Sequence, residues 1–524
     1  MRRKLLLVAA VSCAVLAAWP VVAHFRAKAR LAAYRAELRA QGEKLSITEL
    51  APIPSPGAVA AGIDLVLVAA PTLNHSNLPP SLHTITNGLA WAMCREPILP
   101  TEDHLDLWPA LASTVAENEA AFQTLHAVLE AGEIGFQLNY SQGFNLGLPH
   151  LSRIKSPAQR LSAGALYELH ACHTDRAFAH LRALARLTSV SCDEPLMISE
   201  LVRIAISAIA LNTTWHALQT QLLSETQWAQ LQREWERLHF ARQTEAAFAM
   251  ERAMGELTFR ELREKYQDFS NFGTAGANTG LAELAAIGVE IMQDPMAGLR
   301  QFAHRYPGYW AWVWWGSYED ELLYAKTTQT AIEAARASAV ERTLRATGKP
   351  FQERLALVRK QHPKAGRWLG EDLMISGMIE RLFERVALME LQRSLLVGAI
   401  ALERHRLRHG TYPNSLESLA PEFVASTPID PMDGKPLRYR VSTDGTVLLY
   451  SVGIDGEDQD GNPTLDPKKK GWWYARDAVW PRPASPAEVA TYLDGLKHFS
   501  QKAADYRQRH NLPPAPALEK PATE

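Results

Sequence analysis

The sequence has no excess of charge of either sign. Its 524 residues include 55 Lys and Arg against 57 Asp and Glu, so the formal net charge is -2. Nucleic-acid binding usually requires a strong positive field, and this balance therefore argues against a nucleic acid as a partner. Hydrophobic residues make up 47% of the chain and charged residues 21%, which are values of a folded protein and exclude a disordered one.

Cysteine is scarce. Of the four cysteines, Cys13 falls within an apolar N-terminal run, which leaves Cys94, Cys172 and Cys192. These three allow at most one disulfide, and they lack the paired spacing of a zinc site. The sequence therefore excludes a disulfide scaffold.

Recognisable catalytic motifs are missing as well. Glu251 and Glu256 on a predicted helix resemble the paired carboxylates of acid–base hydrolysis. Charged residues inside apolar helices, such as Glu200 and Arg203, more often form buried or half-buried ion pairs. A non-enzymatic role is thus the first hypothesis, and an envelope hydrolase that uses the helix carboxylates is an alternative.

Strand signals are almost absent from residues 51–394. Apolar residues recur there at spacings of three and four, which predicts a mainly α fold built as an irregular helical bundle or an array of helical hairpins. Ser156-Pro157 predicts the start of one helix. A hairpin is predicted from 161–171 and 177–190, and Ser224 to Gln227 form a capping box at the start of another helix.

One long apolar run is present, at the N-terminus. It extends from Leu5 to Phe25 after three basic residues, and it has about the 20 residues that a bilayer-spanning helix requires. Val21-Val22-Ala23 also satisfies the rule for signal-peptide cleavage, so an anchor and a cleaved signal are both open. The anchor is favoured because the Ala-rich segment 26–42 is able to continue the same helix, which makes residues 5–25 the predicted contact with the lipid bilayer.

Residues 309–315, Tyr-Trp-Ala-Trp-Val-Trp-Trp, contain an unusual density of aromatic side chains. Such clusters occur in carbohydrate sites, protein interfaces and membrane surfaces. Packing in the core is the first interpretation of this cluster, and an interaction surface is its rival.

The pattern changes from about Leu395 onward. A helix to His409 is followed by two predicted strands, 436–442 and 446–453, around the hairpin turn Thr443-Asp444-Gly445. An acidic, Gly-containing loop over 455–466 comes next. The predicted segments are a membrane anchor and juxtamembrane helix at 1–50, a helical domain at 51–394, a small α+β unit at 395–480, and a helical segment with a disordered tail at 481–524.

The α+β unit contains an ordered series of short motifs: Ala401-Leu402-Glu403, His409-Gly410-Thr411-Tyr412-Pro413, Pro428-Ile429-Asp430-Pro431, Gly434 to Tyr439, and Leu449 to Gly456. Over residues 395–466 this series resembles the C-terminal domain of the major pseudopilins of type II secretion. The layout of the whole chain also resembles uncharacterised anchored proteins of planctomycete- or verrucomicrobia-like bacteria.

Major pseudopilins sit in the bacterial inner membrane with this domain in the periplasm, so the resemblance implies a single-pass protein whose bulk is extracytoplasmic. The chain departs from pseudopilins in one respect. Its helix before Gly410 carries Glu403, Arg404, His405, Arg406 and Arg408, which rules that helix out as a membrane stalk. A role as a pilus subunit is therefore not expected, and an accessory component of a type II secretion-like apparatus is a further alternative.

The acidic loop predicts a calcium site. Asp455, Asp458, Asp460 and Asp466 are its expected ligands, because clustered hard oxygen ligands repel one another unless a cation bridges them. The pseudopilin domain also holds calcium in the loop that follows the strand corresponding to Tyr450-Ser451-Val452-Gly453. The leading functional hypothesis is an envelope scaffold that binds an unidentified envelope protein, with a structural calcium site.

Overall fold

The computed structural model describes residues 2–68, 108–190, 192–264, 309–363, 365, 375–441, 447–465, 471–481 and 508, and it describes side chains from Val21 onward except at 110 and 346. Its helices are α1 (Arg2–Ala40), α2 (Ile47–Leu50), α3 (Pro56–Val68), α4 (Trp108–Glu117), α5 (Glu119–Glu130), α6 (Pro149–His170), α7 (Thr174–Leu187), α8 (Met197–Thr220), α9 (Glu225–Glu236), α10 (Phe240–Glu264), α13 (Ser317–Glu341), α14 (Lys349–Gln361) and α15 (Ser376–His409). Short 3-10 turns lie at Tyr140–Asn145, Arg345–Thr347, Leu416–Leu419 and Trp472–Tyr474, and the strands are β1 (Arg438–Val441), β2 (Val447–Ser451) and β3 (Ala478–Val479). Residues 309–315 are also helical.

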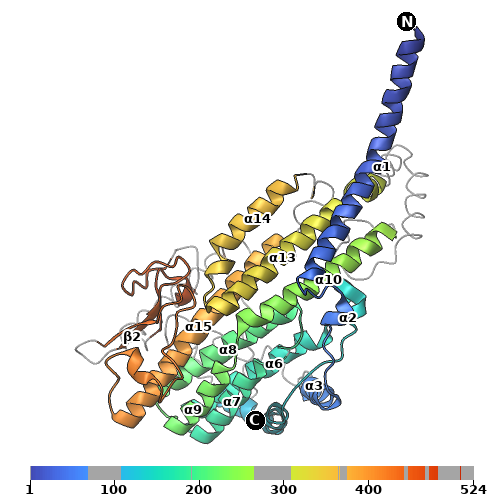
Figure 1. Ribbon diagram of the computed structural model, residues 1–524. Helices are drawn as coiled ribbons and strands as arrows, with labels where there is room; N and C mark the ends of the chain where they lie inside the picture. Colours follow the sequence, from blue (N-terminus) through green and yellow to red (C-terminus); the bar gives the residue numbers. More distant parts are fainter. Residues whose placement is uncertain are drawn as a thin grey trace.

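The long helices form one bundle. Helices α6, α8, α10, α13 and α15 lie along its long dimension, and each contacts at least one of the others (Figure 1). Apolar side chains from all five of these helices and from α9 meet in one core, which includes Trp228, Phe248 and Phe383. The predicted mainly α fold and the helical bundle are thus confirmed over the part of the chain that the structure describes.

The predicted start of a helix at Ser156-Pro157 is wrong. Helix α6 begins earlier, at Pro149, and continues through the buried Pro157. Leu151 and Ile154 are buried on the face that α6 already turns to the core, so packing outweighs the hydrogen bond that proline removes. The capping box is confirmed, because Ser224 Oγ accepts from the Gln227 amide and Gln227 Oε1 accepts from the Ser224 amide.

Helix α1 is continuous from Arg2 to Ala40, as expected if residues 26–42 continue the helix of the apolar run. Its first half projects beyond the bundle and its second half lies against α13 (Figure 1). Among the helices whose side chains the structure describes, α8 is the one that is long and apolar enough to cross a membrane, and 56% of its most apolar stretch is buried in the protein. Such burial is typical of a core helix, so this composition is weak evidence for membrane insertion.

The C-terminal unit is an extension of α15. Leu396, Val397 and Ile400 belong to the bundle core, whereas Leu395 and Leu402 belong to a second core under the small sheet. The predicted boundary at 394/395 therefore lies inside a helix. Helix α15 ends at His409, where Gly410 adopts φ +79° and its amide donates to the Arg406 carbonyl.

The sheet is antiparallel in the order β1-β2-β3, and Tyr439 pairs with Leu449 in the first hairpin. The two predicted strands are confirmed, while the turn at 442–446 lies outside the described residues. Strand β3 was not predicted, because it has only two residues and pairs with a strand about 30 positions earlier. The sheet lies at the end of the bundle opposite the projecting half of α1 (Figure 1).

Candidate functional site

The second half of α1 joins the bundle through one apolar stripe. Ala27, Leu31 and Leu38 are buried, and their spacings of four and seven residues place them on one face of the helix. This face packs against α13, and Lys326 of α13 lies 5.4 Å from the centre of the Tyr34 ring. The contacts follow from the amphipathic pattern that begins where the apolar run ends.

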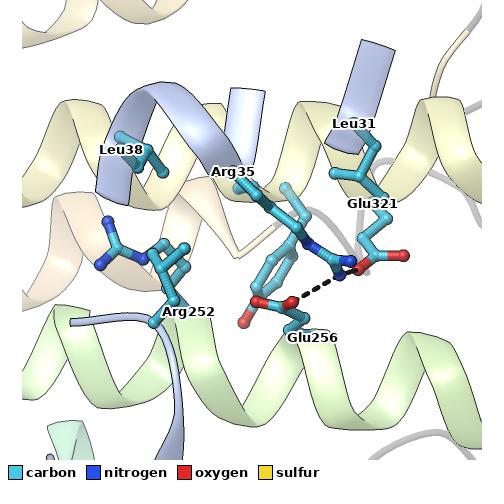
Figure 2. A pocket seen from close by; sticks show the side chains of 9 residues that line it. Leu31, Arg35, Leu38, Arg252, Glu256 and Glu321 are labelled. Carbon is cyan, nitrogen blue, oxygen red and sulfur yellow. Dashed lines mark hydrogen bonds and ion pairs between the residues drawn. The ribbon is translucent and has the colours of Figure 1, made fainter. Parts of the chain in front are cut away.

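Arg35 crosses this interface. Its Nη2 lies 2.6 Å from Glu256 Oε1 on α10 and also contacts Glu321 Oε1 on α13, so a single guanidinium holds three helices together (Figure 2). Glu321 is 2% exposed and makes a second ion pair, at 2.6 Å, with Arg263. Burial raises the pKa of Glu256, and Arg35 opposes that rise. Loss of Arg35 would therefore leave the buried Glu321 carboxylate and the half-buried Glu256 carboxylate with one cation fewer.

A second group of polar contacts lies one turn beyond the end of α1. The Glu43 carboxylate is 3.0 Å from Arg336 Nη1 and 3.6 Å from Arg252 Nη2. Arg252 Nη2 also donates to the Lys44 carbonyl at 2.8 Å, and its Nη1 contacts Gln329. We call the Arg35 and Glu43 contacts together the α1 junction.

The α1 junction encloses a cavity of about 10 Å³ lined by Arg35, Arg252, Glu256, Glu321 and neighbouring apolar residues. That volume accommodates roughly one water molecule. The geometry fits a structural connection between the protruding helix and the bundle, and it leaves no room for an organic substrate.

The two carboxylates of the hydrolase hypothesis do not meet in a cleft. Glu251 and Glu256 are five residues apart, which separates their directions by about 140° around α10. Glu251 is buried beside Tyr324, whose hydroxyl donates to the Glu251 carbonyl at 3.2 Å. Burial raises the pKa of Glu251 to about 7, and the Tyr324 hydroxyl opposes that rise.

Glu200 and Arg203 form the buried ion pair that the sequence predicts, because their side chains are 2.6 Å apart and each is 1% exposed.

The aromatic segment divides between both of its interpretations. Trp312 is fully buried and its Nε1 donates to Asp320 Oδ2 at 2.9 Å, so this indole is part of the core. Trp310, Trp314 and Trp315 are exposed by 55%, 43% and 53%. These three indoles form the exposed surface of the segment, and Trp314 lies beside α1, where its ring is 4.8 Å from the His24 ring.

The acidic loop lies beside β1, and its carboxylates have partners there. Asp458 Oδ2 is 3.1 Å from Arg438 Nε, and Asp458 Oδ1 accepts from Tyr450 Oη. Burial raises the pKa of Asp458, but the Asp460 amide, Arg438 and Tyr450 together bring it below its ordinary value. Asp460 pairs with Arg440 at 2.7 Å and is 85% exposed.

The structure does not bring the predicted calcium ligands together as a group. Asp455 accepts from the Glu457 amide and the Gln459 side chain, and Asp466 lies outside the described residues. No cluster of three or more His, Cys, Asp or Glu with metal-binding geometry occurs among the residues that are described. The calcium site stays a prediction.

Two buried carboxylates that sequence reasoning had not singled out organise this unit. Asp477 is fully buried and accepts from the amides of Gln459, Gly461 and Asn462, which shapes the acidic loop. Asp430 is also fully buried and accepts from Ser451 Oγ at 2.8 Å and the Val452 amide at 2.9 Å.

Burial raises the pKa of Asp430, and its hydrogen bonds oppose that rise. Its signal in the sequence is the apolar setting Pro428-Ile429-Asp430-Pro431. A lone carboxylate between apolar residues and prolines suggests a buried acceptor for backbone amides.

No protein-family model matches this chain, and no curated protein or solved structure shows a significant match to it.

Proposed function

We propose that this protein is a membrane-anchored, extracytoplasmic scaffold of the bacterial envelope. The observation that supports the proposal best is the continuity of α1, whose first half projects from the bundle while its second half is fixed in it (Figure 1). An apolar run of 21 residues, from 5 to 25, occupies the projecting half. At 1.5 Å per residue this run is about 31 Å long, which matches a hydrocarbon core of about 30 Å.

The α1 junction fits such a role. Arg35 ties α1 to both α10 and α13, and the Glu43 contacts tie the following turn to the same two helices. A span that continues into the bundle as one helix holds the bundle at a set height above the bilayer. A scaffold needs that property, whereas a domain on a flexible linker lacks it.

The extracytoplasmic location rests on the pseudopilin resemblance of residues 395–466. The proposed partner of the scaffold is another envelope protein, which crosslinking and affinity capture would identify. The hydrolase alternative gains no support from Glu251 and Glu256, which are directed to different surroundings. The secretion-accessory alternative rests on the resemblance alone.

Membrane extraction and mass spectrometry test the anchor. The full chain should stay in the membrane pellet after alkaline carbonate and should have a mass that includes residues 1–23. Release by carbonate, or a mass that corresponds to cleavage after Ala23, would contradict the anchor. Alkaline phosphatase fused after Glu524 should be active, and a fusion active only as a cytoplasmic reporter would reverse the orientation.

A further inference from the structure

We infer that the outer surface of residues 309–315, formed by Trp310, Trp314 and Trp315, lies in the headgroup region of the bilayer that α1 enters. This inference rests on the proposed membrane anchor. It adds a second, peripheral contact with lipid, which would fix how the bundle is oriented on the membrane.

The short helix at 309–315 carries aromatic side chains on its buried face and also on its exposed side. Tyr309 and Trp312 are three residues apart and are directed inward, and the Tyr309 hydroxyl donates to the Leu262 carbonyl at 2.9 Å. Trp310 and Trp314, four residues apart, share the outer face of the helix, and Trp315, which is also exposed, is turned by about 100° from Trp314. The buried pair fixes the helix on the bundle, so the outer indoles are held on a rigid support.

Contacts with α1 set the position of these indoles along the predicted span. The His24 ring lies 4.8 Å from the Trp314 ring and 5.1 Å from the Tyr318 ring. His24 Nδ1 is also 3.1 Å from the Trp314 carbonyl oxygen. His24 is the penultimate residue of the run from 5 to 25, so Trp314 lies at the level where that run ends.

The level at which an apolar span ends is the membrane–water interface, and tryptophan is enriched there because its ring is apolar while its N–H forms hydrogen bonds. Val21, Val22 and Phe25 of α1 are exposed by 44%, 43% and 59%. They extend the apolar surface from the indoles onto the span itself. An aqueous surface would expose all of these side chains to water at once.

The charges of α1 fit the same level. Arg26 and Lys28 are exposed, and they follow directly after Phe25, within about 5 Å along the helix axis. Arg30 is exposed as well, but it pairs with Glu319 of α13. Basic side chains at this position extend toward lipid phosphates while their aliphatic parts cover apolar surface. The order of apolar span, aromatic surface and basic residues favours a lipid surface over a protein or carbohydrate partner.

The test uses the full chain reconstituted into vesicles of zwitterionic and anionic phospholipid. A cysteine-free background receives single cysteines at Trp310→Cys or Trp314→Cys, each labelled with an environment-sensitive fluorophore. Val340→Cys is the matched control, because Val340 is 79% exposed and lies near the other end of α13, about 35 Å from its start. Emission from the labels at 310 and 314 should shift to the blue and be quenched by brominated lipids, whereas the label at 340 should show neither effect.

A second measurement keeps the native cysteines. The wild-type chain should lose more tryptophan fluorescence to brominated lipids than a W310S/W314S/W315S variant does, with unchanged circular dichroism. Labels at 310 and 314 that behave like the label at 340, in protein that resists carbonate extraction, would overturn the lipid contact and leave the anchor intact. Protein that carbonate releases would overturn both proposals. If the labels at 310 and 314 shift to the blue only after a soluble protein is added, the indoles bind a protein and not lipid.

Discussion

The α1 junction and the hairpin of the C-terminal unit both use arginine–carboxylate pairs, but in opposite ways. In the α1 junction, Arg35 and Glu321 are 286 residues apart in sequence and Glu321 is 2% exposed. In the hairpin, Arg440 and Asp460 are 20 residues apart and Asp460 is 85% exposed. The first pair joins distant helices through a buried carboxylate, and the second lies on an exposed surface.

This difference shows where charge determines structure. Exposed pairs are screened by water and add little free energy, whereas a buried carboxylate strongly destabilises the fold when its partner is lost. In the C-terminal unit, the decisive carboxylates are Asp430 and Asp477, which serve backbone amides and are fully buried. The following substitutions test this ranking.

The largest effect is expected at Asp430. Asp430→Ala should lower the free energy of unfolding by about 3–4 kcal/mol, because it leaves the buried Val452 amide and Ser451 hydroxyl without their acceptor. Urea titration of the full chain measures the loss, and faster hydrogen exchange over 447–452 locates it. Asp430→Asn retains one carbonyl oxygen and should lose less. If Asp430→Ala destabilises the protein less than the loss of the exposed Arg440–Asp460 pair does, the central role of Asp430 is refuted.

Glu251→Gln should change how stability depends on pH. The pKa of Glu251 is about 7 in the folded protein, and its ordinary value is 4.5. The protonated side chain therefore makes its full contribution to the free energy of unfolding below pH 4.5. This contribution is lost as the pH rises to 7 and stays lost at higher pH. The variant lacks this loss and should exceed the wild type by up to about 3 kcal/mol at pH 8. If the urea midpoints of the two proteins differ by the same amount at every pH from 4.5 to 8, the predicted effect of Glu251 is disproved.

Arg35→Met should have a moderate effect. Glu321 keeps Arg263, and Arg35 itself is about one-third exposed, so we expect a loss of about 1–2 kcal/mol. Hydrogen exchange over residues 27–40 should accelerate as α1 separates from the bundle. Arg39→Met is the matched control, because Arg39 is exposed and its ion pair is with Glu49 of the short helix α2. Equal exchange in both variants would remove the structural role of Arg35.

The smallest effect is expected at Asp460. Without calcium, Asp460→Ala should change stability by about 0.5 kcal/mol or less, since the Arg440 pair is exposed. If the predicted calcium site exists, millimolar calcium should raise the thermal midpoint of the wild type and not that of the variant. A wild-type chain whose midpoint is indifferent to calcium and chelator would end the calcium prediction.

The helical bundle and the hairpin were accessible from sequence because their signals are local. Periodicity marked the helices, the Ser224 capping box marked one helix start, and Arg438 to Val441 paired as the alternating pattern indicated. The predicted helix start at Pro157 was wrong because the helix face around it is buried, and this burial keeps α6 intact. A rule based on local sequence does not include such burial.

The α1 junction was not accessible in the same way. Nothing in the sequence near Arg35 indicates that Glu256 and Glu321 are its partners, because their proximity depends on the packing of α10 against α13. The tryptophan segment shows the same limit. Its composition indicated either core or surface, and only the tertiary contacts assign Trp312 to one and Trp314 to the other.

Helix α15 sets the rotational angle between the sheet and the bundle. Residues on one of its faces, such as Leu396 and Ile400, are fixed in the bundle, while Leu395 and Leu402 on another face hold the sheet. One residue inserted between Met389 and Leu395 would turn everything after it by about 100° relative to the earlier bundle contacts. The bundle core would then lose the side chains of Leu396 and Ile400, whereas the core under the sheet, which follows the insertion except for Leu391, would be carried round with the helix. A change of length in the middle of this helix is therefore expected to separate the sheet from its place on the bundle.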